Sequence, residues 1–423
     1  MSSAAASTPA RARSARRTGR SATSGSFSTC SAITWGWRCP RVRPRAAPSS
    51  MHTRLLVLTA AWPSRRFPRT GGFIRILTDG MREEGFDVRV VAPGARGGAE
   101  SAAGFPVPAV RLKTAAPSRV LQFLYIVSAA SACVREGCRR RPDALLVHWV
   151  LPAGPAALWA ARKLGIPLFA WAHGSDLEVY AARGGIMRAA ARAVVRGASG
   201  VFAASGSLCR RAAALGAAAV AHLPVGVASV FKDAPPAPRP AGPFTILFCG
   251  DFIPEKGVRE LVAARRLLGP GRPARWVCAG AGPLGPALAR AGFDVRGALD
   301  AADVAALMDA SRVLVLPSRS EGTPLVIQEA LCRGLPVIAS SVGGVGEVVR
   351  PGREGLLLAP PVRGRTLARA IAELYDTPSL CDTLAAYARA RGAEVRTARE
   401  TAASFRRTLA AWECARGGPP STP

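Results

Sequence analysis

Short runs rich in apolar residues alternate with segments of helical periodicity along most of the chain. The segment FIRILTDGMREEG (73–85), for example, repeats its apolar residues with the period of an α-helix. Apolar runs separated in this way are typical of parallel strands joined by crossover helices. The runs of the first half are RLLVLTA (54–60), DVRVVAP (87–93), DALLVHW (143–149), PLFAWAH (167–173) and GVFAAS (200–205). We therefore predict βαβ units, with helices on both faces of a parallel sheet.

A proline-rich segment, DAPPAPRPAGP (233–243), interrupts this alternation and is the best candidate for a linker. The alternation then resumes. The runs of the second half are TILFCG (245–250), ARWVCAG (274–280), FDVRG (293–297), VLVLPS (313–318), PVIAS (336–340) and GLLLAP (355–360). We predict an α/β fold of two Rossmann-like, doubly wound domains, 51–232 and 244–416, that face a cleft. The second domain ends in C-terminal helices, and 417–423 is expected to be a frayed tail. Open sheets bind ligands at the carboxyl ends of their strands.

The first fifty residues show no hydrophobic periodicity, and they contain nine arginines and no acids. They fit a disordered basic tail, an organellar transit peptide or a start assigned too early. We favour the last interpretation, because Met51 stands just before the predicted first strand. We therefore expect the native chain to start at Met51.

The formal net charge is +30, yet only four of the 57 basic residues are lysines, and the arginines are scattered along most segments. A nucleic-acid-binding protein usually clusters its basic residues. We therefore expect no nucleic-acid partner, and we expect a surface that attracts phosphates, sugar nucleotides and acidic lipid head groups. We expect a cytoplasmic protein, with the inner face of the membrane as a further expected location.

Ten cysteines form no CxxC pair, and several lie in apolar runs, which indicates buried thiols in a reducing compartment and no metal site. No apolar stretch reaches the roughly 20 residues of a transmembrane helix.

Two acids flank the helix predicted after VLVLPS, in the segment SRSEGTPLVIQEALCRGLPV (318–337). We predict that Thr323 caps this helix and that Pro324 is its first residue. The start of a helix offers unpaired N–H groups and a positive dipole end, which together form an anion site. Glu321 precedes that site, and Glu329, about two turns into the helix, could hold a ribose diol. Capping by Glu321 and a solvated face at Glu329 explain the spacing equally well.

Three glycine loops follow other predicted strands. FCGDFIPEKG (248–257) contains Gly250 and Lys256, a retained lysine in a chain that uses arginine for almost every cation. AGAGPLGPAL (279–288) contains Gly282, which packing alone explains about as well as ligand binding. RTGGF (69–73) contains Gly71 and Gly72, where the backbone can approach a phosphate.

Two of the four histidines end apolar strands, in HWVLPAG and AHGSD. A lone histidine at a strand end is more often structural than catalytic. His173, which is followed by an acid in HGSD, is the better functional candidate.

The segment EGTPLVIQE, continued by ALCRGLPVIASSVGGVGEVV, resembles the retaining glycosyltransferases of family 4, which have the B-type fold. The segment from DALLVH to HGSD resembles them as well, and the likeness covers about 51–415. LPVGVASVFK matches more loosely, with Val225 and Ala228 in place of the usual Asn and Asp.

The resemblance implies a role for each candidate residue. Glu321 lies near the hydroxyls of the transferred sugar, and Glu329 holds the ribose. Lys256 meets the diphosphate, and His173 lies beside the anomeric centre. The backbone that contacts sugar and phosphate belongs to Gly322, Thr323, Pro324 and Leu325, with Gly71 and Gly72 opposite.

One position departs from the family pattern. An arginine usually follows the strand-end glycine, Gly250, but here the residue is Asp251. We predict that Arg319 replaces the lost cation, with Arg69 as the second candidate. A weak or degenerate site is the alternative.

The resemblance implies a metal-independent, retaining hexosyltransferase in cell-surface polysaccharide or glycolipid synthesis. The donor is a nucleotide-diphosphate sugar, without a cofactor, and the acceptor is a carbohydrate or a lipid-linked molecule. Peripheral contact with an anionic membrane is also expected. The alternatives are a nucleotide-sugar epimerase of the same architecture and a degenerate sugar-nucleotide-binding protein.

Overall fold

The structure, a computed structural model, describes residues 53–63, 71–93, 102–105, 119–181, 184–236 and 242–415. In the first half a seven-stranded parallel sheet has the order β3-β2-β1-β4-β5-β6-β7. Its strands are β1 (Arg54–Thr59), β2 (Asp87–Pro93), β3 (Ala102–Phe105), β4 (Ala144–His148), β5 (Leu168–Ala172), β6 (Gly200–Ala203) and β7 (Val220–His222).

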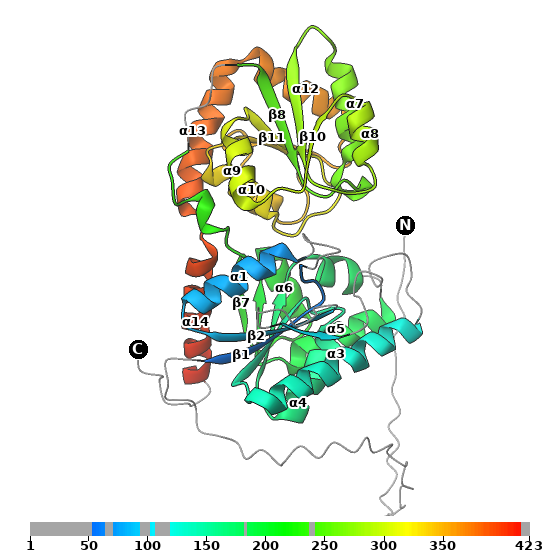
Figure 1. The fold of residues 1–423 in the computed structure, drawn as a ribbon, viewed down its shortest axis with the longest axis vertical. Coiled ribbons are helices and arrows are strands. Elements are labelled where there is room, and N and C mark those ends of the chain that lie inside the picture. The colour runs from blue at the N-terminus through cyan, green and yellow to red at the C-terminus, as the bar shows by residue number, and fades with distance from the viewer. Residues whose placement is uncertain are drawn as a thin grey trace, which may run out of the picture. The chain divides into compact units, whose positions relative to one another are not determined.

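Helices cover both faces of this sheet. The strand order runs outward from β1 in one direction and from β4 in the other, so right-handed crossovers place α1 and α4 on opposite faces. Figure 1 shows α3, α4 and α5 as neighbours. The helices of this half are α1 (Gly72–Glu83), α3 (Arg119–Arg140), α4 (Gly154–Leu164), α5 (Gly185–Gly197) and α6 (Gly206–Ala214), with short turns η1 (Asp176–Tyr180) and η3 (Ser229–Phe231).

A second parallel sheet of six strands has the order β10-β9-β8-β11-β12-β13. Its strands are β8 (Phe244–Cys249), β9 (Ala274–Ala279), β10 (Asp294–Gly297), β11 (Val313–Leu316), β12 (Val337–Ser340) and β13 (Gly355–Leu358). Its helices are η4 (Pro254–Lys256), α7 (Val258–Leu268), α8 (Gly285–Arg290), α9 (Ala301–Asp309), α10 (Leu325–Cys332), α11 (Val345–Val348), α12 (Gly364–Asp376) and α13 (Pro378–Glu394). The predicted fold class, two doubly wound α/β domains, is therefore confirmed.

All eleven apolar runs form strands, and the structure adds β3 and β7, which the sequence did not predict. β3 is the Ala- and Gly-rich segment AAGF, and β7 has only three residues, none of them fully buried. Neither has the dense apolar composition that marked the other strands. The predicted extension 1–50, the tail 417–423 and the centre of the linker, 237–241, lie outside the described residues.

The last helix, α14 (Ala398–Ala415), corrects the predicted boundary of the second domain at 416. Phe405 and Leu409 of α14 are buried in the core of the first sheet, and Trp412 packs against that core. By contrast, Leu384 and Ala388 of α13 belong to the core of the second sheet. The chain therefore returns to the first domain after α13.

Each sheet has one point at which the strand order reverses, between β1 and β4 in the first and between β8 and β11 in the second. Ligands of doubly wound folds bind at such switch points, beyond the carboxyl ends of the strands. Gly71 follows β1 and Lys256 follows β8, while Glu321 follows β11. His173 follows β5, the neighbour of β4. The topology thus places the predicted site residues where the fold favours a ligand.

Candidate functional site

The loops after β8 and β11 lie directly against each other. The backbone N–H of Arg319 donates to the carbonyl oxygen of Glu255 at 2.8 Å. Gly257 has a φ of +73°, and a Cβ there would lie 2.1 Å from the carbonyl oxygen of Pro317. Only glycine allows this conformation together with so close an approach. The packing brings Lys256 beside the loop that contains Glu321.

Lys256 and Glu321 form an ion pair, with Nζ and Oε1 2.7 Å apart. The Glu321 side chain is 8% exposed and that of Lys256 27%. The carboxylate is thus almost fully removed from water, while the ammonium keeps one side open. A lysine in this position can turn to a second anion, and the multiple charges of a diphosphate would compete well with one carboxylate.

The loop at Glu321 and Gly322 rests on a second glycine pair. Gly343 has a φ of +53°, and a Cβ there would lie 1.8 Å from the Glu321 carbonyl oxygen. The N–H of Gly344 donates to the Gly322 carbonyl oxygen at 2.8 Å. These glycines belong to the segment SSVGGVGE, for which no role was predicted. Their adjacent positions after β12 were the available signal.

The start of α10 differs from the prediction. The helix begins at Leu325, Pro324 occupies the N-cap position, and no side chain caps the helix. The Thr323 hydroxyl donates instead to the carbonyl oxygen of Ala204 at 2.8 Å. A threonine hydroxyl can cap its own helix or donate to a distant carbonyl oxygen. Here it donates to the carbonyl oxygen of Ala204, just after β6. The unpaired N–H groups at the start of this helix therefore stay available to a ligand.

The backbone at His173 meets the same loop. A Cβ on Gly322 would lie 2.1 Å from the His173 carbonyl oxygen, so only glycine fits at that point. This contact brings the predicted residues His173 and Gly322 together. Glu321 directly precedes Gly322 in the chain.

The ring of His173 contacts the ring of His148, with Nδ1 of His148 2.9 Å from Nε2 of His173. Burial lowers the pKa of His148 to about 3. Burial, followed by the nearby His148, lowers the pKa of His173 well below its ordinary value. Both imidazoles are therefore neutral near pH 7, and one donates to the other. His173 thus offers hydrogen bonding, not a positive charge.

Aromatic rings enclose His173. Phe73 and Trp149 have ring centroids 5.1 and 5.3 Å from it, both in edge-on geometry. Phe73 follows Gly71 and Gly72, and Gly71, at φ +74°, lies so close to Ala61 that a Cβ would be 2.3 Å from its carbonyl oxygen. The glycine loop after β1 therefore lies beside His173, a proximity that the sequence did not predict.

Asp176 is a buried residue that sequence reasoning noted only as the acid of HGSD. Its carboxylate accepts hydrogen bonds from the backbone N–H groups of Val150, Gly174, Leu177 and His173, at 2.9, 3.0, 3.1 and 3.3 Å. Burial raises its pKa to about 6, and the N–H groups oppose that rise. Because Val150 lies after β4 and His173 after β5, one carboxylate fixes both strand-end loops.

The predicted replacement for the missing arginine has a partner already. Nη2 of Arg319 lies 3.0 Å from Oε1 of Glu260 on α7, and the Arg319 side chain is 59% exposed. Asp251 is exposed on the loop after β8. Arg69 lies outside the described residues. A second anion at Arg319 would therefore have to displace Glu260 or share the guanidinium with it.

The other two predicted glycines, Gly250 and Gly282, lie in loops that pack against each other. Gly282 has a φ of +154°, and a Cβ there would lie 2.7 Å from the Phe252 carbonyl oxygen. A Cβ on Gly280 would lie 1.9 Å from the carbonyl oxygen of Gly250. Packing between these loops is thus a sufficient reason for glycine at 280 and 282.

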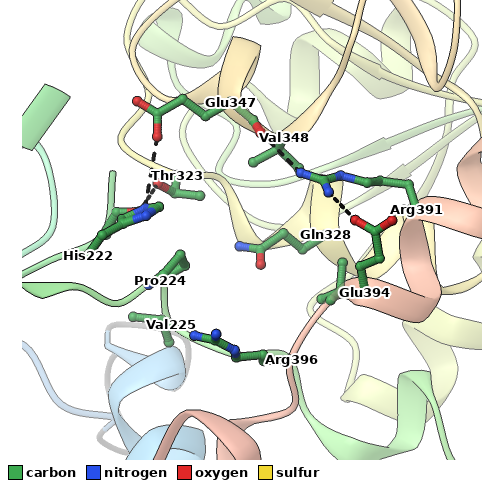
Figure 2. Close-up of a pocket in the computed structure, with 12 residues that line it drawn as sticks. His222, Pro224, Val225, Thr323, Gln328, Glu347, Val348, Arg391, Glu394 and Arg396 are labelled. Atoms are coloured by element: carbon green, nitrogen blue, oxygen red, sulfur yellow. Dashed lines mark hydrogen bonds and ion pairs between the residues drawn. The ribbon is translucent and has the colours of Figure 1, made fainter. Parts of the chain in front are cut away.

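A cavity of about 260 Å³ lies next to α10. Gln328 lines it, and its buried Nε2 has no hydrogen-bond partner among the described residues. Glu347 accepts from the N–H groups of Gly206 and Ser207 and lies 4.0 Å from His222 Nε2. Figure 2 shows Glu347 and His222 on one side of the cavity. Of the predicted site residues, Thr323 alone lines this cavity, and Glu329 is the residue after Gln328 on α10.

Within the described ranges, no group of three or more His, Cys, Asp or Glu side chains could hold a metal ion. Among the same residues, no helix is both long enough and apolar enough to cross a membrane.

Comparison with known families assigns both halves of the chain. Residues 243–377 match the model of the glycosyl transferases group 1, and residues 71–227 match that of the glycosyl transferase 4-like domain. A Bacillus subtilis protein assigned to teichuronic acid biosynthesis, the glycosyltransferase TuaC, is 30% identical over 355 residues, which cover 75% of this chain and 88% of that protein. The 2-deoxystreptamine glucosyltransferase of Streptomyces kanamyceticus is 32% identical over 294 residues, covering 60% and 74%.

Solved structures share the fold. Sucrose-phosphate synthase from Thermosynechococcus elongatus superimposes with a TM-score of 0.68 at 18% identity, covering 86% of this chain and 100% of that chain. HepE of Anabaena in complex with UDP-glucose gives a TM-score of 0.66 at 18% identity, covering 85% and 100%.

Proposed function

Because this chain belongs to the glycosyl transferases of group 1, it is a glycosyltransferase that uses nucleotide sugars, and we propose that it transfers its sugar with retention of anomeric configuration. The acceptor is a hydroxyl group on a carbohydrate or a lipid-linked molecule. The observation that carries the proposal is the Lys256–Glu321 pair, 2.7 Å apart at the switch point of the second sheet.

The reaction breaks the bond between the anomeric carbon and the diphosphate oxygen and joins that carbon to the acceptor oxygen. The proton of the acceptor hydroxyl leaves with the diphosphate, on which negative charge grows as the first bond breaks. Among the residues that the structure describes, Lys256 is a cation placed to meet that charge. The N–H groups at the start of α10, which no side chain caps, would meet it as well. Removing one such contact typically costs about 3 kcal/mol of transition-state stabilisation, or more than a hundredfold in rate. Catalysis on this account is electrostatic, and we assign no separate nucleophile and no metal.

Glu321 and His173 orient the sugar. When the diphosphate draws Lys256 away, the Glu321 carboxylate is left free to accept from a sugar hydroxyl. A buried carboxylate without its lysine needs such a donor, because an unpaired buried charge is costly. His173 is neutral, and it can donate or accept at the same sugar without adding charge near the anomeric centre.

The relative TuaC, which is assigned to teichuronic acid biosynthesis, supports this acceptor class. We propose that this chain acts in cell-surface polysaccharide or glycolipid synthesis. Glu329 would hold the ribose of the donor, and Arg319 would release Glu260 to meet the diphosphate.

A thermal-shift screen of UDP-, GDP- and ADP-sugars tests donor use. We expect one nucleotide series to raise the melting temperature of the full chain, with the nucleoside diphosphate alone giving a smaller shift. UDP-glucose comes first, because HepE was solved with it. If no nucleotide sugar shifts the midpoint, the proposal fails. If a donor is converted without any acceptor, an epimerase replaces it.

Asp251 motivates one further outcome, donor binding without turnover. An acid at this position repels the diphosphate, and Arg319 is paired with Glu260 in the structure. A donor that binds but is never consumed with any acceptor would favour a degenerate sugar-nucleotide-binding protein.

A further inference from the structure

The outer surface of α3, α4 and α5 combines exposed apolar side chains with positive charge. Seven of the ten large hydrophobic residues that are exposed in the described part of the chain lie on these three helices. Single exposed hydrophobic residues are ordinary, but a group of them marks an interaction site. We call this surface the α3–α5 face. Its apolar members are Val120, Leu121, Phe123, Leu124, Val127, Trp159 and Ile186.

α3 carries apolar residues on two opposite sides. Tyr125, Ala129 and Cys133 are fully buried against the sheet. Val120, Leu124 and Val127, spaced by four and three residues, form a second stripe that points away from the sheet. Phe123, beside this stripe, is 65% exposed. An ordinary surface helix is polar on that side.

The length of α3 explains why no neighbouring helix within the described ranges covers this stripe. α3 has 22 residues, about 33 Å, and α4 has 11, about half that length. A Cβ on Gly137 of α3 would lie 2.5 Å from Leu164, the last residue of α4. The two helices run in the same direction. Val127 lies ten residues before Gly137, and Gly154 lies ten residues before Leu164, so Val127 is level with the start of α4. Phe123 and Leu124 therefore lie beyond the first residue of α4, where α4 cannot cover them.

The exposed charges of the face are all positive. Its single acid, Glu136, is buried and paired with Arg89. Each of the other long helices, α1, α7, α12, α13 and α14, contains at least one acid. Among the described helices of eleven or more residues, only these three lack an acid that is at least partly exposed, although the shorter α6 and α8 contain no acid either. The basic members of the face are Arg135, Arg139, Arg140, Arg162, Lys163, Arg188, Arg192 and Arg196.

We propose that the α3–α5 face docks on the surface of an anionic phospholipid bilayer. Phe123, Trp159 and Ile186, which are 65%, 53% and 80% exposed, would enter the boundary between head groups and acyl chains. The arginines would meet the anionic head groups. A second copy of this chain fits the face poorly, because it would place the same set of cations opposite one another.

Docking by this face has a consequence for the site. α3, α4 and α5 each follow a strand, so they begin at the carboxyl edge of the first sheet, where His173 lies. The uncovered first turns of α3 and the residue Ile186 at the start of α5 belong to that same edge. The bilayer would therefore lie next to the sheet edge that presents His173. The inference goes beyond the proposed function, since binding to lipid needs no turnover.

Sedimentation with lipid vesicles tests the proposal on the full chain. The vesicles contain phosphatidylcholine alone or equal parts of phosphatidylcholine and phosphatidylglycerol, at low and high salt. We expect binding to the anionic vesicles, weakened by salt. Phe123→Glu, and separately Arg188→Glu with Arg192→Glu, should each weaken binding by about tenfold or more.

Leu267→Glu and Arg369→Glu, at exposed positions on α7 and α12, are the matched controls and should bind like the wild type. Circular dichroism and the thermal midpoint confirm that each variant is folded. Equal binding by Phe123→Glu and the wild type would overturn the proposal, as would no binding by the wild type. A dimer seen by light scattering and lost in Phe123→Glu would assign the face to a second copy instead. Transfer to a soluble acceptor should be unchanged in Phe123→Glu, so lipid docking and the proposed function can fail separately.

Discussion

Single side chains at the site are held in charge-balanced pairs, and Lys256 is the one that the account depends on. Its ammonium neutralises Glu321 in the structure and is expected to meet the diphosphate during transfer. Lys256→Ala should reduce kcat at least tenfold in a transfer assay, because one cation facing the leaving group is lost.

The same change leaves Glu321 buried without its partner, which lowers stability by itself. The double variant Lys256→Ala with Glu321→Gln removes that unpaired charge and separates folding from chemistry. Arg369→Ala, which removes an exposed cation on α12, is the control. Unchanged turnover in a folded Lys256→Ala variant would remove the phosphate role.

Substitution of Arg319 tests whether this residue compensates for Asp251, which stands where the family usually has an arginine. If Arg319 supplies the missing cation, Arg319→Ala should be nearly as damaging to turnover as Lys256→Ala. Glu260→Gln should keep or improve donor affinity, because it frees the guanidinium from its carboxylate. An exposed ion pair contributes at most about 1 kcal/mol, so both variants should stay folded. Wild-type turnover in Arg319→Ala would assign the residue to the surface ion pair alone.

The buried histidines make stability depend on pH. In the unfolded chain His148 takes up a proton below about pH 6.5, whereas in the folded protein its pKa is about 3. The free energy of unfolding therefore falls as the pH falls through that window, by about 1.4 kcal/mol per pH unit for this residue. Asp176, whose folded pKa of about 6 is raised, works in the opposite direction. Stability from Asp176 grows as the pH falls from 6 toward 4.

The substitution His148→Asn removes one of these two titrating groups. Urea unfolding at pH 7, 6 and 5 should show a smaller loss of stability in the variant than in the wild type. If the free energy of unfolding changes with pH equally in the two proteins, His148 titrates normally in the folded state.

Several site residues could be predicted from the chain and others could not. Lys256, Glu321 and His173 lie in loops that follow strands placed by periodicity, so their convergence followed from the topology. Asp176 was missed as a positioning residue, because its four backbone donors come from two separate loops. The engagement of Arg319 by Glu260 lies equally beyond sequence reasoning, since it joins a loop to a helix 59 residues away.

Helices and loops position the site through close backbone contacts, and the glycine pair after β12 offers the sharpest test. Gly343→Ala places a Cβ at a φ of +53°, 1.8 Å from the Glu321 carbonyl oxygen. The Glu321 loop must move, so we expect turnover to fall by at least tenfold and stability by about 1 kcal/mol. Thermal unfolding and transfer rate are measured together.

Gly346→Ala is the matched control, because a Cβ at Gly346 meets nothing within 4 Å. It should leave both stability and turnover near the wild type. Equal turnover in the two glycine variants would show that the loop at Glu321 does not need this support.

The element boundaries show where local rules succeed and fail. Dense apolar runs predicted eleven strands, since burial on both faces leaves a plain signature. The start of α10 was predicted at Pro324 with Thr323 as its cap, and this was wrong by one residue. Local preference favoured the cap, but the hydroxyl of Thr323 pairs with Ala204, 119 residues away in the chain. Long-range partners of this kind leave no trace in spacing.

The molecule as a whole contains two Rossmann-like cores, and α14 shows what periodicity cannot reveal. The apolar face of α14 is visible in the sequence, yet the partner of that face is not. Phe405 packs with Phe202 at a centroid distance of 4.7 Å, so α14 joins the core of the first sheet. An amphipathic pattern predicts that a helix is covered, and only the structure says by which domain.

The stereochemistry of the transfer reaction tests the proposed function most directly. The donor identified by the nucleotide-sugar screen is incubated with the full chain and an acceptor fraction extracted from native membranes. Proton NMR of the product then gives the anomeric configuration of the new linkage. We predict the configuration of the donor sugar, formed by the wild type and reduced at least tenfold in Lys256→Ala. An inverted linkage, or conversion of the donor with no sugar on the acceptor, would contradict the account.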